Sequence, residues 1–271
     1  MPPAARARQA IGPAHPIELN GRVLGGGRQP LVCTPLVGRN SAAILAELDK
    51  VAAKGPDLIE WRVDFFEGIG NFEDVVDLAT RMKAVALRTP LIFTCRSRAE
   101  GGEPTPLSED EAVLLYARAC ESGCVELIDY ELRNDPERVR RLREVSRRHG
   151  VRMIISYHNF ERTPAVEILD EKFLAAERMG ADIAKVAVMP ADLKDVLTLL
   201  AATLRANENL GIPLMSMSMG ALGSLTRMFG WAFGSAIAFA VGESSSAPGQ
   251  VPIEDLQTVS RILRKALAAG Q

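Results

Sequence analysis

The sequence predicts an α/β protein folded as a (β/α)8 TIM barrel. Apolar, strand-like runs alternate with amphipathic helical runs to the end of the chain, and eight strand candidates follow one another. Most of them are almost continuously apolar, which is typical of parallel strands covered by helices. Eight such units in 271 residues fit one barrel. A doubly wound open sheet is the alternative, but no GxGxxG turn follows the first strand.

The elements can be assigned in chain order. A flexible N-terminal extension is expected over residues 1–14, and a single barrel domain over residues 15–271. The stretch from Ile17 to Arg22, with the glycines at 25–27, suits a short N-terminal β-hairpin. The eight barrel strands are then expected over residues 31–37, 58–65, 91–97, 125–132, 152–159, 183–189, 213–219 and 236–242.

The helices between these strands carry recognisable ends. Ser108 and Glu111 form a capping-box pattern, and Pro136 suits a first helical turn. The arginine-rich stretch over residues 138–148 is broken by apolar residues at helical spacing, so we interpret it as one solvated helix face. Glycines that suit helix ends are Gly123, Gly150, Gly180 and Gly211.

Composition argues against several classes of function. The net charge of −2 gives no field that favours nucleic acid or a membrane surface, and no apolar run reaches transmembrane length. The first fourteen residues lack the apolar core of a secretory signal, so we expect a cytoplasmic protein. With three scattered histidines and no CxxC pair, neither a metal nor a disulfide framework is expected. The cysteines, expected to be reduced, are Cys33, Cys95, Cys120 and Cys124.

One lysine stands out from its surroundings. Lys185 lies within an apolar, strand-like run over residues 183–189, where an ammonium group is costly to desolvate. Desolvation favours the neutral amine, which is a nucleophile towards ketones, so Schiff-base chemistry on a carbonyl substrate is one interpretation. The alternative is a mid-strand charge that reaches solvent or pairs with a carboxylate.

Further polar residues follow the carboxyl ends of the predicted strands, where TIM barrels carry their active sites. Alternating charges on the second and fourth strands share one face of each strand. An ion-pair layer that closes the barrel mouth would explain any of them singly, but their convergence favours an active site. His158 is well placed there as a proton shuttle. The charged residues are Glu60, Arg62, Asp64, Arg96, Glu100, Asp129 and Glu131.

Taken together, these segments resemble the type I 3-dehydroquinate dehydratase family. The similarity runs in unbroken order from about Leu31 to Leu256. The family is a (β/α)8 barrel, commonly a homodimer, that uses no metal or organic cofactor. The matching segments are EWRVD, FTCRSRAEGGE, IDYEL, SYHNF, AKVA, SMSMGALGSLTR, FGSAIAF and SAPGQ.

The resemblance implies a role for individual residues. Lys185 would form the iminium with the ketone, His158 would act as general base and acid, and Glu100 would orient His158. Arg227 would hold the substrate carboxylate. The remaining substrate-binding residues would be Glu60, Arg62, Arg96, Ser246, Gln250, Met219 and Phe239.

Within that set, Ser246 and Gln250 lie in a loop similar to the family's closing lid, and Met219 and Phe239 would form apolar walls. The family often has aspartate after the catalytic histidine, where this chain has Asn159.

The implied activity is a lyase reaction: dehydration of 3-dehydroquinate to 3-dehydroshikimate by syn elimination, a step that serves aromatic biosynthesis or quinate breakdown. Two alternatives remain at this point. A class I aldolase would use the same iminium for carbon–carbon cleavage, and a ligand-binding barrel would keep the fold without turnover.

Overall fold

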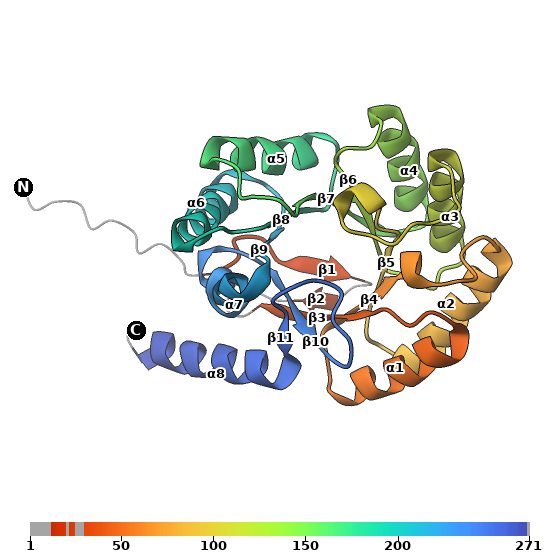
Figure 1. Ribbon diagram of the computed structural model, residues 1–271, viewed down its shortest axis with the longest axis horizontal. Helices are drawn as coiled ribbons and strands as arrows, with labels where there is room; N and C mark the ends of the chain where they lie inside the picture. Colours follow the sequence, from red (N-terminus) through yellow and green to blue (C-terminus); the bar gives the residue numbers. More distant parts are fainter. Residues whose placement is uncertain (1–11, 20–21, 25–29, 270–271) are drawn as a thin grey trace, which may run out of the picture.

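Eight parallel strands form a closed ring in this protein, with helices around the outside (Figure 1). The structure is a computed structural model that describes residues 12–19, 22–24 and 30–269. The predicted (β/α)8 barrel is confirmed. Its strands are β3 (Leu31–Leu36), β4 (Leu58–Arg62), β5 (Leu91–Thr94), β6 (Leu127–Glu131), β7 (Arg152–Asn159), β8 (Ile183–Val188), β9 (Leu214–Ser218) and β10 (Ile237–Val241).

The ring closes between β9 and β10, where the pairing is short. Seven successive pairs of barrel strands, from β10–β3 round to β8–β9, are parallel ladders. The last gap is bridged by a parallel contact between Leu214 and Ser235, and the N–H of Ala236 donates to the carbonyl of Leu214 at 2.7 Å. A further two-residue strand, β11 (Val251–Pro252), pairs with the outer end of β10 and was not predicted.

The helices cover the outer face of the ring. The capping box of Ser108 and Glu111 is present, and Pro136 occupies the first turn of its helix. Gly123 and Gly150 follow helices with φ of 67° and 71°, a conformation that favours glycine. The helices are α1 (Ser41–Ala53), α2 (Phe72–Ala86), α3 (Glu109–Glu121), α4 (Pro136–Arg148), α5 (Val166–Arg178), α6 (Leu193–Asn209), α7 (Gly220–Phe229) and α8 (Ile253–Ala269).

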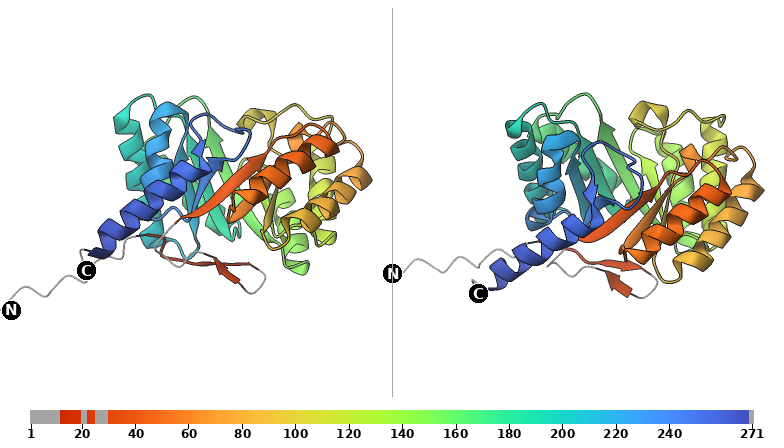
Figure 2. Two further views of the ribbon diagram at one scale, coloured as in Figure 1. Left: turned by 90° about the horizontal axis from the view of Figure 1, so that it is seen from below. Right: turned by 60° about the horizontal axis from the view of Figure 1, so that its bottom comes forward.

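The predicted N-terminal hairpin lies across the amino-terminal end of the barrel (Figure 2). Its strands, β1 (Ile17–Leu19) and β2 (Arg22–Leu24), pair antiparallel. Ile17 and Leu19 pack against residues that begin the barrel strands, so the hairpin closes this end with apolar side chains. Residues 1–11 of the predicted extension and the glycines at 25–27 lie outside the described residues.

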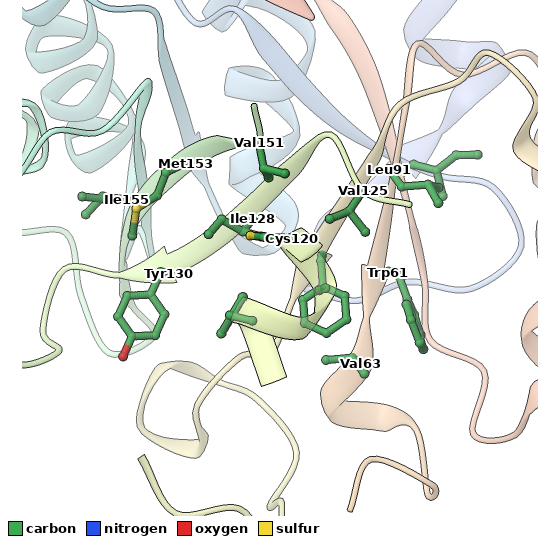
Figure 3. Packing of buried hydrophobic residues seen from close by; sticks show 14 of the residues in the cluster. Trp61, Val63, Leu91, Cys120, Val125, Ile128, Tyr130, Val151, Met153 and Ile155 are labelled. Atoms are coloured by element: carbon green, nitrogen blue, oxygen red, sulfur yellow. The ribbon is translucent and has the colours of Figure 1, made fainter. Parts of the chain in front are cut away.

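The larger apolar core lies between the strands and the helices. Figure 3 shows part of it, with Trp61, Ile128 and Met153 contributed by β4, β6 and β7. Edge-to-face aromatic contacts run through this layer, including Trp61 with Phe93 at 5.6 Å and Phe93 with Tyr116 at 5.4 Å between ring centroids. This packing fixes the strands whose carboxyl ends carry the polar residues.

Some local predictions were wrong. Strand β5 ends at Thr94, three residues before its predicted end. Strand β4 ends at Arg62, and Val63–Phe65 forms a 3₁₀ turn. The prediction ran too far because the alternating apolar and charged pattern continues past the point where strand pairing stops. Arg143 is buried, contrary to the expected solvated face of its helix, and its guanidinium pairs with Asp182 at 2.7 Å. Within the described part of the chain, we find no helix long and apolar enough to cross a membrane.

Candidate active site

One cavity at the carboxyl end of the barrel is lined by every residue that the sequence assigned to catalysis or substrate binding. Strand order alone does not place them together; the tilt and closure of the barrel do. The eleven are Glu60, Arg62, Arg96, Glu100, His158, Lys185, Met219, Arg227, Phe239, Ser246 and Gln250.

Lys185 is buried in the middle of β8 and is paired rather than isolated. Its Nζ lies 2.6 Å from Oδ2 of Asp129 and 3.7 Å from Oε1 of Glu60. The amine also stands 4.7 Å from the centre of the Phe239 ring, within cation–π range. Two carboxylates and an aromatic ring therefore surround the nitrogen within the cavity.

Asp129 stands at the centre of a buried polar network. Its Oδ1 accepts from the hydroxyl of Ser156 at 2.6 Å and lies 2.8 Å from Nη2 of Arg96. Arg96 reaches on to Glu131 at 3.2 Å. Although burial alone would raise it, Arg96 and Lys185 hold the pKa of Asp129 well below its ordinary value. Asp129 is therefore a permanent carboxylate beside the lysine.

His158 is held by two hydrogen-bond contacts to one oxygen. Oε2 of Glu100 accepts the backbone N–H of His158 at 3.0 Å and lies 2.8 Å from Nδ1 of its ring. We assign the proton to Nδ1, which lets this oxygen act as acceptor for both groups. The tautomer leaves Nε2 with a free lone pair for a substrate proton.

Burial and neighbouring charges set the charge of this pair. Burial, followed by Arg96 and Lys185, lowers the pKa of His158 well below its ordinary value. Burial, followed by the charge of Glu131, raises the pKa of Glu100 to about 8. Near neutral pH the pair therefore consists of a neutral imidazole and a protonated carboxyl. The expected carboxylate partner of the histidine is thus mostly neutral at that pH.

Arg62 and Glu60 belong to the same strand end. The guanidinium of Arg62 makes a bidentate pair with Asp64, at 2.8 and 2.7 Å. The hydroxyl of Thr94 donates to Oε1 of Glu60 at 3.0 Å. Arg62 also donates to the carbonyl of Ser246 at 3.4 Å and so contacts the loop that covers the cavity.

Arg227 differs from the other cavity cations. It is 2% exposed, and no carboxylate pairs with it among the residues that the structure describes. Its Nη2 donates to the carbonyl of Pro248 at 3.2 Å, whereas its buried Nε has no hydrogen-bond partner. Burial lowers its pKa to about 10. A buried guanidinium with a free donor is suited to binding an anion.

The loop that carries Ser246 and Gln250 is folded on itself over the cavity. Oε1 of Gln250 accepts the backbone N–H of Ser246 at 3.1 Å, and Nε2 of Gln250 donates to the hydroxyl of Ser246 at 3.2 Å. The carbonyl of Pro248 accepts from Gly220 at 3.1 Å as well as from Arg227. These contacts join the loop to α7.

The structure adds residues that sequence reasoning left out of the site. Asp129 was noted as a charged strand residue, but its pairing with Lys185 depends on side-chain geometry across the barrel. Phe160 directly follows the HN pair of β7, which was a usable signal. The other cavity residues that were not predicted are Gly101, Ala187, Met217 and Ala247.

Asn159 shapes the turn after β7. Its Oδ1 accepts the backbone N–H groups of Glu161 and Arg162 at 3.0 and 2.9 Å, and its Nδ2 donates to the hydroxyl of Tyr157 at 3.2 Å. These bonds make an Asx-type turn. The residue therefore has a structural explanation that does not require a charge. No group of three or more residues suited to holding a metal ion occurs in the described ranges.

The family model for type I 3-dehydroquinase matches residues 32–266. The chain is 54% identical to the 3-dehydroquinate dehydratase of Albidiferax ferrireducens, over 94% of this chain and 97% of that protein. It is 52% identical to the enzyme of the same name from Aromatoleum aromaticum, over 93% and 96% of the two chains.

Solved structures of 3-dehydroquinate dehydratases are similar to this chain along nearly its whole length. The crystal structure of 3-dehydroquinate dehydratase from Geobacillus kaustophilus superposes with a TM-score of 0.91 at 46% identity, covering 95% of this chain and 99% of that one. A type I enzyme from Clostridium difficile, solved with covalently modified comenic acid, superposes with a TM-score of 0.89 at 35% identity and covers 93% and 99% of the two chains.

Proposed function

This chain belongs to the type I 3-dehydroquinase family, and from that premise we propose how its cavity carries out the reaction. The reaction is the dehydration of 3-dehydroquinate to 3-dehydroshikimate, a hydro-lyase step of the shikimate pathway. We assign the covalent role to Lys185 and the proton transfers to His158. The observation that supports this assignment is that both residues line one cavity, each held by a carboxyl group.

The lysine supplies the electron sink. In the proposed first step, the neutral amine of Lys185 attacks the ketone carbon, and the resulting carbinolamine takes up one proton from solvent and loses water to give a cationic iminium. Asp129 stays ionised and close to the nitrogen, so it stabilises the cationic iminium after the bond forms.

His158 then carries one proton through the elimination. Nε2 removes the proton on the carbon next to the iminium, and the electrons of that C–H bond form a neutral enamine. The enamine expels the hydroxyl from the next carbon, and the imidazolium returns the proton to it, so that water leaves. Hydrolysis of the product iminium frees Lys185. One base that serves both transfers acts on one face of the ring, as a syn elimination requires.

Arg227 and the covering loop hold the substrate. The substrate carboxylate binds the free Nε edge of Arg227. The carboxylate thereby supplies the negative charge that this guanidinium lacks as a partner. Nη2 of the same guanidinium keeps its bond to the loop carbonyl of Pro248. Ser246 and Gln250 then close the cavity above the ring hydroxyls, with Glu60, Arg62 and Arg96 below them and Met219 and Phe239 as apolar walls.

The class I aldolase alternative uses the same lysine and makes a different product. Relatives above 50% identity carry the dehydratase name, which favours dehydration. The direct test is to add 3-dehydroquinate and follow the ultraviolet absorbance of the conjugated enone. We expect the absorbance to rise without cofactor. A folded protein that gives no such signal, or that cleaves a carbon–carbon bond, contradicts the proposal.

Two further expectations concern the protein in the cell. We extend the proposal to a homodimer in the cytoplasm, since the family is commonly dimeric and its reaction belongs to a biosynthetic pathway. Sedimentation equilibrium at micromolar concentration measures the assembly directly. A mass equal to one chain of 29.3 kDa at every concentration contradicts the dimer.

A further inference from the structure

Phe160 is an aromatic residue at the cavity to which the proposed mechanism gives no role. It follows β7 directly and lines the same cavity as His158. Its side chain is 37% exposed, so it stands at the boundary between the cavity and solvent. The Phe160 and His158 rings stack with centroids 6.5 Å apart and an angle of 22° between their planes. This distance lies within the range of favourable offset stacking.

The same ring also contacts the segment that carries Glu100. Gly101 directly follows Glu100 and has a φ of 83°. A Cβ atom added at Gly101 would lie 2.3 Å from Cζ of Phe160, so the ring packs against bare backbone there. Phe160 therefore stacks on His158 and also packs against Gly101, the residue next to Glu100.

The turn after β7 directs Phe160 towards this position. Asn159 accepts the backbone N–H groups of Glu161 and Arg162, which folds the chain immediately around Phe160. The ring is therefore placed by its own turn and by the backbone of Gly101.

We propose that Phe160 is a positioning residue of the dehydration: its ring fixes the plane of the His158 imidazole and shields the His158–Glu100 pair from bulk water. The inference rests on the proposed function of His158. Burial is the largest cause of the lowered pKa of His158, so a cover over this ring bears directly on its basicity. The charges that also act on His158 come from Arg96, Lys185, Asp129 and Arg62, with Glu100 hydrogen-bonded to it, and none of them is altered by a change at Phe160.

The experiment compares Phe160→Ala with Phe160→Tyr, which keeps the ring, and with Leu174→Ala. Leu174 is equally exposed, at 37%, and lies on the next helix, α5, so it is a matched control. For Phe160→Ala we expect kcat to fall about tenfold, the upper range of one aromatic pair. The acid limb of kcat/KM should move to higher pH, because water reaches the imidazole. The Tyr and Leu174 variants should keep wild-type values.

Unchanged kcat together with an unchanged acid limb in Phe160→Ala overturns the proposal. If that variant folds poorly, Phe160→Leu carries the test, since it keeps an apolar cover and loses the flat ring. We then expect lower kcat with the acid limb in place, and wild-type kcat overturns the positioning role. Borohydride trapping of the substrate on Lys185 separates the two claims: a trapped adduct in a slow Phe160 variant supports the positioning role, whereas no adduct in the wild type contradicts the proposed function itself.

Discussion

Two layers of the barrel interior lie only two residues apart along the same strands, yet they differ completely in character. On β8, Ile183 belongs to the apolar layer and Lys185 to the polar one. The same step separates Leu127 from Asp129 on β6. Other pairs of this kind are Leu58 with Glu60 and Ile154 with Ser156.

This contrast shows how a barrel can bury so many charges. The apolar layer lies nearer the amino-terminal end of the barrel and is called the lower layer; the polar layer is the upper one. The hairpin side chains Ile17 and Leu19 close the lower layer, which supplies apolar burial. The upper layer satisfies nearly all of its polar atoms within one network, from Arg96 through Asp129 to Lys185. Arg227 is the exception: its Nε has no hydrogen-bond partner, and we assign this donor to substrate binding. Substitutions in the two layers should therefore fail in different ways.

The largest effect is expected in the upper layer. His158→Ala removes the only proposed base and should lower kcat by about 10²- to 10⁴-fold, the range for general acid–base catalysis. Iminium formation at Lys185 should persist, because the lysine is held by Asp129 and not by the histidine. Steady-state kinetics with borohydride trapping measures both. A variant with ordinary turnover contradicts the role of His158.

The lower layer should respond in stability instead. Ile183→Ala deletes buried apolar atoms and should lower the free energy of unfolding by about 2–5 kcal/mol. We expect kcat to change less than about threefold. Urea denaturation and kinetics on the same preparation make the comparison, with Lys185→Met on the same strand as the matched change in the upper layer. A large loss of kcat in a folded Ile183→Ala enzyme would break the distinction between the layers.

Arg227 should separate binding from stability. Arg227→Met removes the proposed carboxylate clamp, and KM should rise about 10- to 100-fold, since a hydrogen bond to a charged group contributes about 1.5–3 kcal/mol. The melting temperature should not fall, because the lost guanidinium has no carboxylate partner within the described structure. Arg62→Met is the control: it leaves the buried carboxylate of Asp64 without its guanidinium partner and should lower the melting temperature. Equal thermal losses in both variants contradict this account.

The smallest effect concerns pH. Glu100 has a pKa raised to about 8, so it keeps its proton below that pH and loses it above. Glu100→Gln imitates the neutral form, and kcat/KM should fall less than about threefold below pH 7 and about tenfold above pH 9. The acid limb from His158 should lie below its ordinary value of 6.5 in both enzymes. A loss as large below pH 7 as above pH 9 would mean that Glu100 is ionised throughout and would contradict the raised pKa.

Much of this arrangement could be predicted from the sequence because strand periodicity and strand ends are local signals. The run from Arg152 gave β7 its observed bounds, and its last residues place His158 at the cavity. The end of β4 was missed because Val63–Phe65 continues the strand pattern inside a turn. The closure of the ring at Leu214 and Ser235 rests on one short contact that no local pattern marks.

For the site, too, local features could be predicted from the sequence and contacts across the barrel could not. Residue types and strand-end positions indicated six of the cavity residues, and the family resemblance added the other five; all eleven line one cavity. Which atom pairs with which could not be predicted, because the bond from Lys185 to Asp129 and the stacking of Phe160 on His158 depend on distances across the barrel. The sequence left open whether the lysine of this apolar run stays unpaired or pairs with a carboxylate; in the folded barrel two carboxylates lie beside it.

The most direct test of the central claim is borohydride reduction in the presence of 3-dehydroquinate, followed by peptide mapping with mass spectrometry. The account predicts one substrate-derived adduct, on the peptide that contains Lys185, and none in Lys185→Met. A stable adduct on a surface lysine such as Lys50, or an active enzyme in which Lys185 is never modified, would contradict it.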